Sequence, residues 1–271
     1  MSDSSPPSKP TIRLLHHMAR SGGTLISRCL GSMQGVCLLS EIHPDGTTHP
    51  KAKRYRLSPL KQAAEWHGLI DPQDLKIFRN HPPSFQQIMW LIEERATARG
   101  LKLLVRDWSH MDWIGKPFYQ PAYESKLADC FKEYTVHRHC TVRHPIDQYL
   151  SLFKLGIIAK SDLTIDEYLE GMLQFSKLCH KIGFTRYEDL THAPNPHLKH
   201  ICAQLALDFD PSYIERWSSF KHITGDVSFS RGGAEAIRPL KRRAAPDDLV
   251  DQFRARETYS QIKQLLGYET D

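Results

Sequence analysis

Short apolar segments alternate with segments of helical spacing along most of this 271-residue chain. The predicted strands cover residues 11–18, 36–39, 101–106, 134–143 and 184–187, and the predicted helices cover 24–33, 57–66, 83–99, 145–158, 164–181, 196–207 and 246–266. Strands that alternate with helices favour a mostly parallel sheet with helices on both faces. Because no Pro/Gly-rich linker or internal repeat interrupts the pattern, we expect a single domain over 11–271, after a disordered lead-in over 1–10.

The composition excludes several classes of protein. With 40% hydrophobic and 25% charged residues, the chain is not disordered, collagen-like or a coiled coil. Its net charge of +5 favours an anionic ligand but is too small for a protein that coats nucleic acid. No apolar run approaches the roughly 18–20 residues of a membrane span, and the N-terminus lacks a signal-peptide core. Six scattered cysteines without a CxxC pair predict reduced thiols and a cytoplasmic protein.

A glycine-containing turn between the first predicted strand and helix is the first candidate binding site. Its sequence is HMARSGGT, in which Gly22 and Gly23 allow a sharp turn and close approach of a ligand to the backbone. The helix that begins at Thr24 directs free N–H groups towards the same place. Arg20, Ser21 and Thr24 add a cation and two hydroxyls, so the turn predicts a site for phosphate or a similar oxyanion. The alternative is a turn that serves only chain reversal.

The segment CTVRHPIDQYLSLF is the second candidate. Arg143 ends a predicted strand, Pro145 suits the first turn of a helix, and Ser151 lies eight residues after Arg143. A basic residue at a strand end and a hydroxyl two turns into the next helix can both reach one phosphate. The alternative is that Arg143 pairs with a surface carboxylate and that Ser151 faces solvent.

Taken together and in this order, the two segments resemble the sulfotransferases that use 3′-phosphoadenosine-5′-phosphosulfate (PAPS). The resemblance implies that RSGGT binds the 5′-phosphosulfate and that Arg143 and Ser151 bind the 3′-phosphate. It also implies a P-loop-like three-layer α/β/α fold with a central, mostly parallel sheet. Cytosolic members of the family carry Lys where Arg20 stands, and Arg keeps the charge while suiting fork-like contacts to an oxyanion.

Two later segments extend this resemblance over most of the chain. The string RYEDL resembles a family motif that closes a strand near the adenine, which implies that Tyr187 lies beside the nucleotide. Residues 221–243 carry six Lys or Arg against two acidic residues, so nearly all of the net positive charge falls there. They resemble the late basic loop that folds over the nucleotide, and the matching positions are Ser230, Arg231, Gly232 and Gly233.

Transfer of a sulfuryl group needs an in-line acceptor oxygen, donors for the charge on the departing phosphate, and a base near the acceptor proton. Arg20 and the loop amides can supply the donors without a metal ion. Glu41 is the first candidate base, because related bacterial carbohydrate sulfotransferases place a catalytic glutamate in the corresponding segment. It falls in a predicted polar loop over 40–51, so the alternative is a solvated acid. His43 is a second candidate, since histidine titrates near neutral pH.

Further candidates follow the predicted strand 101–106, in the segment RDWSHMD. Open α/β sheets place ligands at the carboxyl ends of their strands, so His110 and Asp112 are plausible as a base or in the acceptor site. The family that the chain resembles often carries a histidine on this loop. The alternative is a structural loop held by Trp108 and Trp113.

The expected function is that of a PAPS-dependent sulfotransferase that acts on a hydroxyl of a small-molecule or glycan acceptor and releases 3′,5′-ADP. We expect no metal requirement and no nucleic-acid partner. Two alternatives stay open at this point. One is a P-loop-like kinase, which the missing Walker lysine disfavours, and the other is a non-catalytic nucleotide-binding protein on the same fold.

Overall fold

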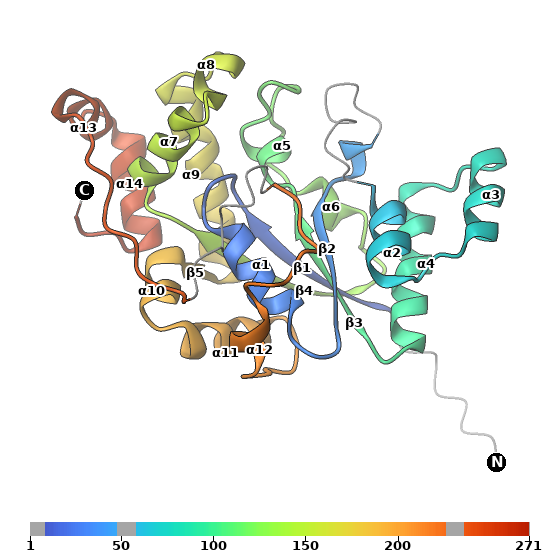
Figure 1. Ribbon diagram of the computed structural model, residues 1–271. Coiled ribbons are helices and arrows are strands. Elements are labelled where there is room, and N and C mark those ends of the chain that lie inside the picture. The colour runs from blue at the N-terminus through green and yellow to red at the C-terminus, as the bar shows by residue number, and fades with distance from the viewer. Residues whose placement is uncertain (1–8, 48–57, 226–235, 271) are drawn as a thin grey trace.

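The computed structural model describes residues 9–47, 58–225 and 236–270 of the chain. Its centre is a five-stranded sheet in the order β2-β3-β1-β4-β5, in which every neighbouring pair of strands is parallel (Figure 1). The strands are β1 Thr11–His17, β2 Val36–Ile42, β3 Lys102–Asp107, β4 Thr135–Val142 and β5 Phe184–Arg186. All five coincide with predicted strands, so the prediction of a mostly parallel sheet is confirmed.

Helices cover both faces of this sheet because successive strand side chains point to opposite faces. Leu15, Leu38 and Leu104 pack into a core with the first helix and the helices near residue 200, whereas Leu14 and Val105 pack into a second core on the other face. Figure 1 shows the helices of residues 59–98 beside β2 and β3, and the C-terminal helices beyond β5. The helices are α1 Gly23–Gly31, η1 Pro44–Gly46, α2 Pro59–His67, α3 Pro72–Asn80, α4 Phe85–Ala98, α5 His110–Trp113, α6 Lys126–Asp129, α7 Pro145–Lys154, α8 Ile157–Ser161, α9 Ile165–Ile182, α10 Tyr187–His192, α11 Pro194–Gln204, α12 Tyr213–Arg216, α13 Asp247–Arg254 and α14 Glu257–Leu266.

Several predicted boundaries are wrong for identifiable reasons. The helix expected over 145–158 divides into α7 and α8, because Gly156 takes a left-handed φ of 68° between them. The helix expected over 246–266 divides into α13 and α14 at Ala255 and Arg256. The polar loop expected from residue 40 begins later, because β2 continues through Glu41 to Ile42. The helix expected over 164–181 corresponds to α9, which a capping box of Thr164 and Glu167 starts.

Two further observations concern the cysteines and the helices. All six cysteines lie in the described part of the chain and are free thiols, five of them buried. Burial raises the pKa of several of these thiols, that of Cys37 to about 12, so they are poor nucleophiles near neutral pH. Among the described helices, none combines the length and the apolar character needed to cross a membrane.

Buried His139 makes the stability of the fold depend on pH. It is fully buried in β4, its Nε2 lies 2.9 Å from Thr185 Oγ1, and burial lowers its pKa to about 3. The unfolded chain binds a proton on this imidazole near pH 6.5, but the folded chain does not. The free energy of unfolding therefore falls as the pH is lowered below 6.5, with a slope from this group that approaches about 1.4 kcal/mol per pH unit.

The variant His139→Gln isolates this contribution, because glutamine cannot take up the proton. We expect urea unfolding of the variant between pH 4.5 and 7.5 to give a flatter dependence of the free energy on pH than the wild type. Equal slopes for the two proteins would show that His139 does not contribute in this range.

Candidate active site

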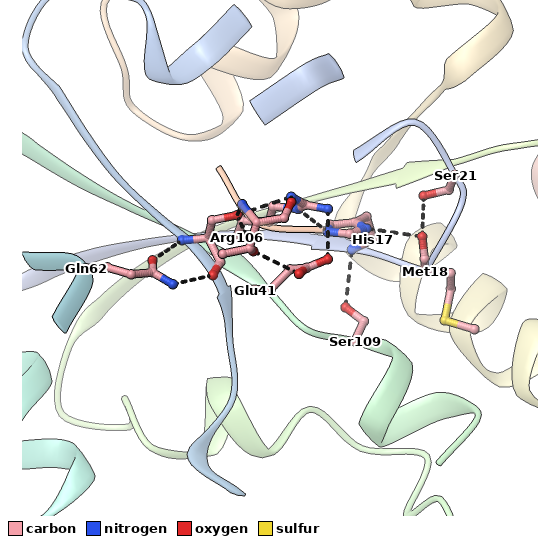
Figure 2. A network of polar contacts seen from close by, with 9 residues as sticks. His17, Met18, Ser21, Glu41, Gln62, Arg106 and Ser109 are labelled. Atoms are coloured by element: carbon pink, nitrogen blue, oxygen red, sulfur yellow. Dashed lines mark hydrogen bonds and ion pairs between the residues drawn. The ribbon is translucent and has the colours of Figure 1, made fainter. Parts of the chain in front are cut away.

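The candidate segments converge at the carboxyl edge of the sheet. Because all strands are parallel, the loop after β1, the end of β2, the end of β3 and the turn from β4 into α7 meet at one edge. We refer to residues 18–22, between β1 and α1, as the anion loop. Figure 2 shows the polar contacts that connect this loop with Glu41 and Arg106.

The anion loop has the local geometry of an oxyanion cradle. Arg20 and Gly22 both take left-handed φ angles, 72° and 90°, which turn the chain sharply ahead of α1. The Ser21 amide and hydroxyl both donate to the carbonyl of Met18, at 3.2 and 2.7 Å. Gly22, the N-cap residue, has no side chain to cap the helix. Among the described residues no side chain caps α1, so its first amides are available to a ligand.

Tyr187 packs on this loop, and Arg143 lies beside the Tyr187 ring. A Cβ atom on Gly22 would lie 2.1 Å from Tyr187 Cδ2, so only glycine allows the ring to rest on the loop backbone. The Arg143 guanidinium carbon lies 5.1 Å from the centre of the same ring. Burial raises the pKa of Tyr187, while the charges of Arg143 and Arg243 act in the opposite direction. The expected proximity of RSGGT, Arg143 and Tyr187 is therefore observed.

Arg20 and Ser151 meet directly, although the sequence placed them in separate phosphate subsites. Arg20 Nε donates to Ser151 Oγ at 2.7 Å. Ser151 is buried, so the alternative in which it faces solvent is wrong. Arg143 is also buried, and its Nε has no partner among the residues that the structure describes. A pairing of Arg143 with a surface carboxylate is thus not seen within those residues.

Glu41 points into this site because β2 is irregular at its end. Its φ of 54° and the shift in the β2–β3 register after Leu39 mark a bulge. The side-chain amide of Gln62 in α2 holds the backbone of Ser40, the residue before Glu41. It accepts from the Ser40 amide at 2.7 Å and donates to the Ser40 carbonyl at 2.9 Å. The Glu41 side chain is only 15% exposed, so the alternative of a solvated loop acid is wrong.

Both carboxylate oxygens of Glu41 accept hydrogen bonds. Arg106 Nη2 lies 3.2 Å from Oε1, and Thr224 Oγ1 donates to Oε2 at 2.8 Å. A Cβ on Gly225 would lie 2.5 Å from Oε1, so the backbone of residue 225 packs against the carboxylate. The segment that ends at Gly225 therefore covers one side of Glu41 and leads into the predicted loop at Arg231, Gly232 and Gly233, which lies outside the described residues.

Arg106 is the site residue that sequence reasoning missed. It lies at the end of β3, is 3% exposed, and uses all three guanidinium nitrogens. Nε donates to His17 Nε2, Nη1 donates to Ser40 Oγ and the Thr224 carbonyl, and Nη2 contacts Glu41. Burial lowers its pKa and Glu41 raises it. The sequence feature that could have indicated Arg106 is its position as a charged residue at the end of the apolar segment LKLLVR.

His43 and Asp112 are paired with each other rather than open to a substrate. His43 Nδ1 accepts from the Asp45 amide, so Nε2 carries the proton that it donates to Asp112 Oδ1 at 3.0 Å. The other Asp112 oxygen accepts from the Lys126 amide at 3.1 Å. Both side chains are fully buried. Their contacts are those of residues that hold two loops together.

His110 is buried, and the charge of Glu41 acts on it. Its Nε2 donates to the Lys116 carbonyl at 2.8 Å, which leaves Nδ1 as the unprotonated nitrogen. Burial lowers the pKa of His110, while the Lys116 bond and the Glu41 charge raise it. The lowered pKa favours the neutral imidazole, and His110 remains a candidate base.

The rest of the RYEDL motif has a structural role. Arg186 pairs with Asp189 at 2.7 Å and donates to the carbonyl of Gly267. Glu188 accepts from the His144 amide at 3.0 Å and from the Tyr268 hydroxyl at 2.9 Å. These contacts fix the backbone on which Tyr187 is carried.

Arg242 and Arg243, at the end of the late basic loop, are held beside α7. Arg242 Nε lies 2.7 Å from Asp147 Oδ2, and the Arg243 amide donates to the other oxygen of Asp147 at 3.0 Å. The charge of Arg243 acts to lower the pKa of Tyr187.

Comparisons with known proteins identify the fold. No family model matches the sequence, and no curated protein matches it. The sulfotransferase domain of the Synechococcus PCC 7002 olefin synthase superposes with a TM-score of 0.68 at 18% identity, over 98% of each chain. The sulfotransferase domain from the curacin biosynthetic pathway gives 0.65 at 18% identity, over 97% of this chain and 100% of that chain. This confirms the P-loop-like fold class, and the chain has the fold of sulfotransferase domains.

Proposed function

We propose that the chain is a sulfotransferase that moves a sulfuryl group from PAPS to an acceptor hydroxyl and releases 3′,5′-ADP. The observation that carries the proposal is the meeting of two anion-binding segments from distant parts of the sequence. Arg20 of the anion loop and Ser151 of α7 are in contact at 2.7 Å, with Arg143 and Tyr187 beside them. A ligand with phosphate groups at two positions fits such a pair of segments better than one with a single phosphate.

The residues present fit this nucleotide. The Nε atoms of Arg143 and Arg243 are buried and have no partner in the described part of the protein, and phosphate oxygens are suitable acceptors for them. The first amides of α1 and the bare backbone of Gly22 can receive a second anionic group. PAPS, when bound, supplies the sulfuryl group and a good leaving group. Arg20 and the loop amides would stabilise the charge left on the 5′-phosphate.

Glu41 is the proposed general base. A carboxylate offers about four acceptor sites, and the contacts to Arg106 and Thr224 use two of them. An acceptor hydroxyl can therefore donate to Glu41 while Arg106 remains bound. Arg106 keeps the carboxylate oriented. Because the site is largely buried, the attraction between the two charges is stronger than it is in water. The fold shared with two sulfotransferase domains supports this assignment of the chemistry.

The nucleotide preference tests the proposed function. We expect 3′,5′-ADP to stabilise the protein against thermal unfolding, by about 2.7 kcal/mol at a concentration 100 times its Kd. At equal concentration, 5′-AMP, 3′-AMP and ATP should give clearly smaller shifts of Tm. Mass spectrometry then follows 3′,5′-ADP release from PAPS across small-molecule alcohols and glycans. A Tm that is insensitive to 3′,5′-ADP would contradict the proposal.

A further inference from the structure

We propose that His17 is a positioning residue that connects the anion loop to Glu41 through Arg106. The inference rests on the proposed function, because it assigns a task within that site. His17 is the last residue of β1, directly ahead of the anion loop, and its side chain is buried. It lies between the loop and Arg106, in the middle of the chain of polar contacts in Figure 2.

The two ring nitrogens of His17 have different partners, and these determine its tautomer. Nε2 accepts from Arg106 Nε, which always carries a proton, so Nε2 must be the unprotonated nitrogen. Nδ1 therefore carries the hydrogen and donates it to the carbonyl of Met18 at 3.1 Å. Burial and the charge of Arg106 lower the pKa of His17 well below its usual value, so the ring stays neutral.

The carbonyl of Met18 connects the His17 side chain to the anion loop. This oxygen also accepts the amide and hydroxyl of Ser21, so three donors of the loop region converge on one atom. The ring itself lies against the start of α1, because a Cβ on Gly23 would come within 2.6 Å of it. A shift of the loop on nucleotide binding would thus be transmitted to the imidazole.

Arg106 connects His17 to Glu41, the proposed base. The guanidinium is planar, so anchoring Nε on His17 sets the direction of Nη1 and Nη2. Nη2 then faces Glu41, while Nη1 reaches Ser40 and Thr224. Without an acceptor at Nε, the buried guanidinium would lose one of its fixed contacts and its orientation towards Glu41. Misplacement of about 1 Å in such groups can lower a rate by about 100-fold.

Two substitutions separate the contacts of His17. In His17→Asn the side-chain amide can replace Nδ1–H and donate to Met18, but nothing reaches Arg106. In His17→Gln the amide oxygen can replace Nε2 and accept from Arg106. We expect His17→Asn to lower kcat about 10- to 100-fold with the KM for PAPS nearly unchanged. His17→Gln should restore most of kcat and instead raise the KM for PAPS. Equal effects of both variants on kcat and KM would overturn the proposal.

A matched control and a second background complete the test. His139→Gln replaces another buried strand histidine, outside the site, and should leave kcat unchanged. In a Glu41→Gln background, His17→Asn should lower kcat by less than about threefold, since both act through the same ion pair. Losses that multiply would overturn the proposal. If the wild type itself does not use PAPS, the proposed function fails. If the wild type turns over and His17→Asn matches it, only the His17 proposal fails.

The tautomer of His17 can be measured in the unmodified protein, and this test does not depend on whether the variants fold. The ¹⁵N chemical shifts of the His17 ring, in protein labelled with ¹⁵N, distinguish the two neutral tautomers and the cation. We expect the neutral Nδ1–H tautomer at pH 7, persisting at pH 5.5. The Nε2–H tautomer, or a protonated ring at pH 7, would overturn the contact with Arg106.

Discussion

Replacing Glu41 by Gln lowers kcat for sulfuryl transfer by about 10²- to 10⁴-fold, the range that a general base contributes. Glutamine keeps the size of the side chain, and its amide oxygen can still accept from Arg106 while its amide nitrogen donates to the Thr224 hydroxyl. It cannot accept the proton of the acceptor. Because Glu41 lies on β2 rather than in the anion loop, the Kd for 3′,5′-ADP should stay within about threefold of that of the wild type. Single-turnover kinetics at saturating PAPS, combined with calorimetric titration of 3′,5′-ADP, measure the two quantities separately.

Two further variants make this result specific. Glu65→Gln removes an exposed carboxylate of α2, which pairs with Lys61 on the surface, and should leave kcat unchanged. His110→Asn tests the second candidate base. If His110→Asn lowers kcat as strongly as predicted for Glu41→Gln while Glu41→Gln is active, His110 is the base. If both variants retain full activity, neither side chain is the base.

The second large effect is expected at Arg143. Arg143→Gln should raise the Kd for 3′,5′-ADP by about 30- to 1000-fold, equivalent to roughly 2–4 kcal/mol for a buried charged contact. The Kd for 5′-AMP, which lacks the 3′-phosphate, should rise by less than about threefold if Arg143 binds that group only. The buried position of the guanidinium and its unpartnered Nε are the reasons for so large an effect. Calorimetric titration of both nucleotides gives the two ratios.

The comparison of nucleotides serves as an internal control. Arg79→Gln, which removes an exposed arginine of α3, corrects for the loss of one unit of charge and should change neither Kd. An equal loss of affinity for 5′-AMP and 3′,5′-ADP would show that Arg143 supports the whole nucleotide site. The assignment of Arg143 to the 3′-phosphate would then be wrong.

Sequence alone predicted the parts of the site that depend on local chain geometry. The order of strand end, Pro145 and Ser151 places Arg143 and a hydroxyl on one side of a helix start, and the structure has both buried there. Gly22 at the end of the anion loop, Gly23 at the start of α1 and the absence of a side-chain cap on this helix likewise follow from a short stretch of sequence.

The remaining parts depend on contacts between distant segments. Glu41 reaches the site because Gln62 pins the bulge at Ser40 from another element, 22 residues away. In the sequence Arg106 is an isolated charge at the end of an apolar strand. Only the fold shows that Ser40, Thr224 and His17 accept hydrogen bonds from its guanidinium. The sequence around His43 predicts a candidate base, whereas in the fold its Nε2 is hydrogen-bonded to Asp112, 69 residues later.

The contacts of residues 267–270 with the start of α7 have a consequence for work with the protein. Thr270 accepts from His144 at 3.0 Å, and Tyr268 donates to the Glu188 carboxylate that caps the His144 amide. His144 directly follows Arg143, so these last described residues brace the backbone under the proposed 3′-phosphate site. Affinity tags, fluorescent fusions and immobilisation handles therefore belong ahead of Thr11 rather than next to residue 270, if measured affinities are to reflect the native pocket.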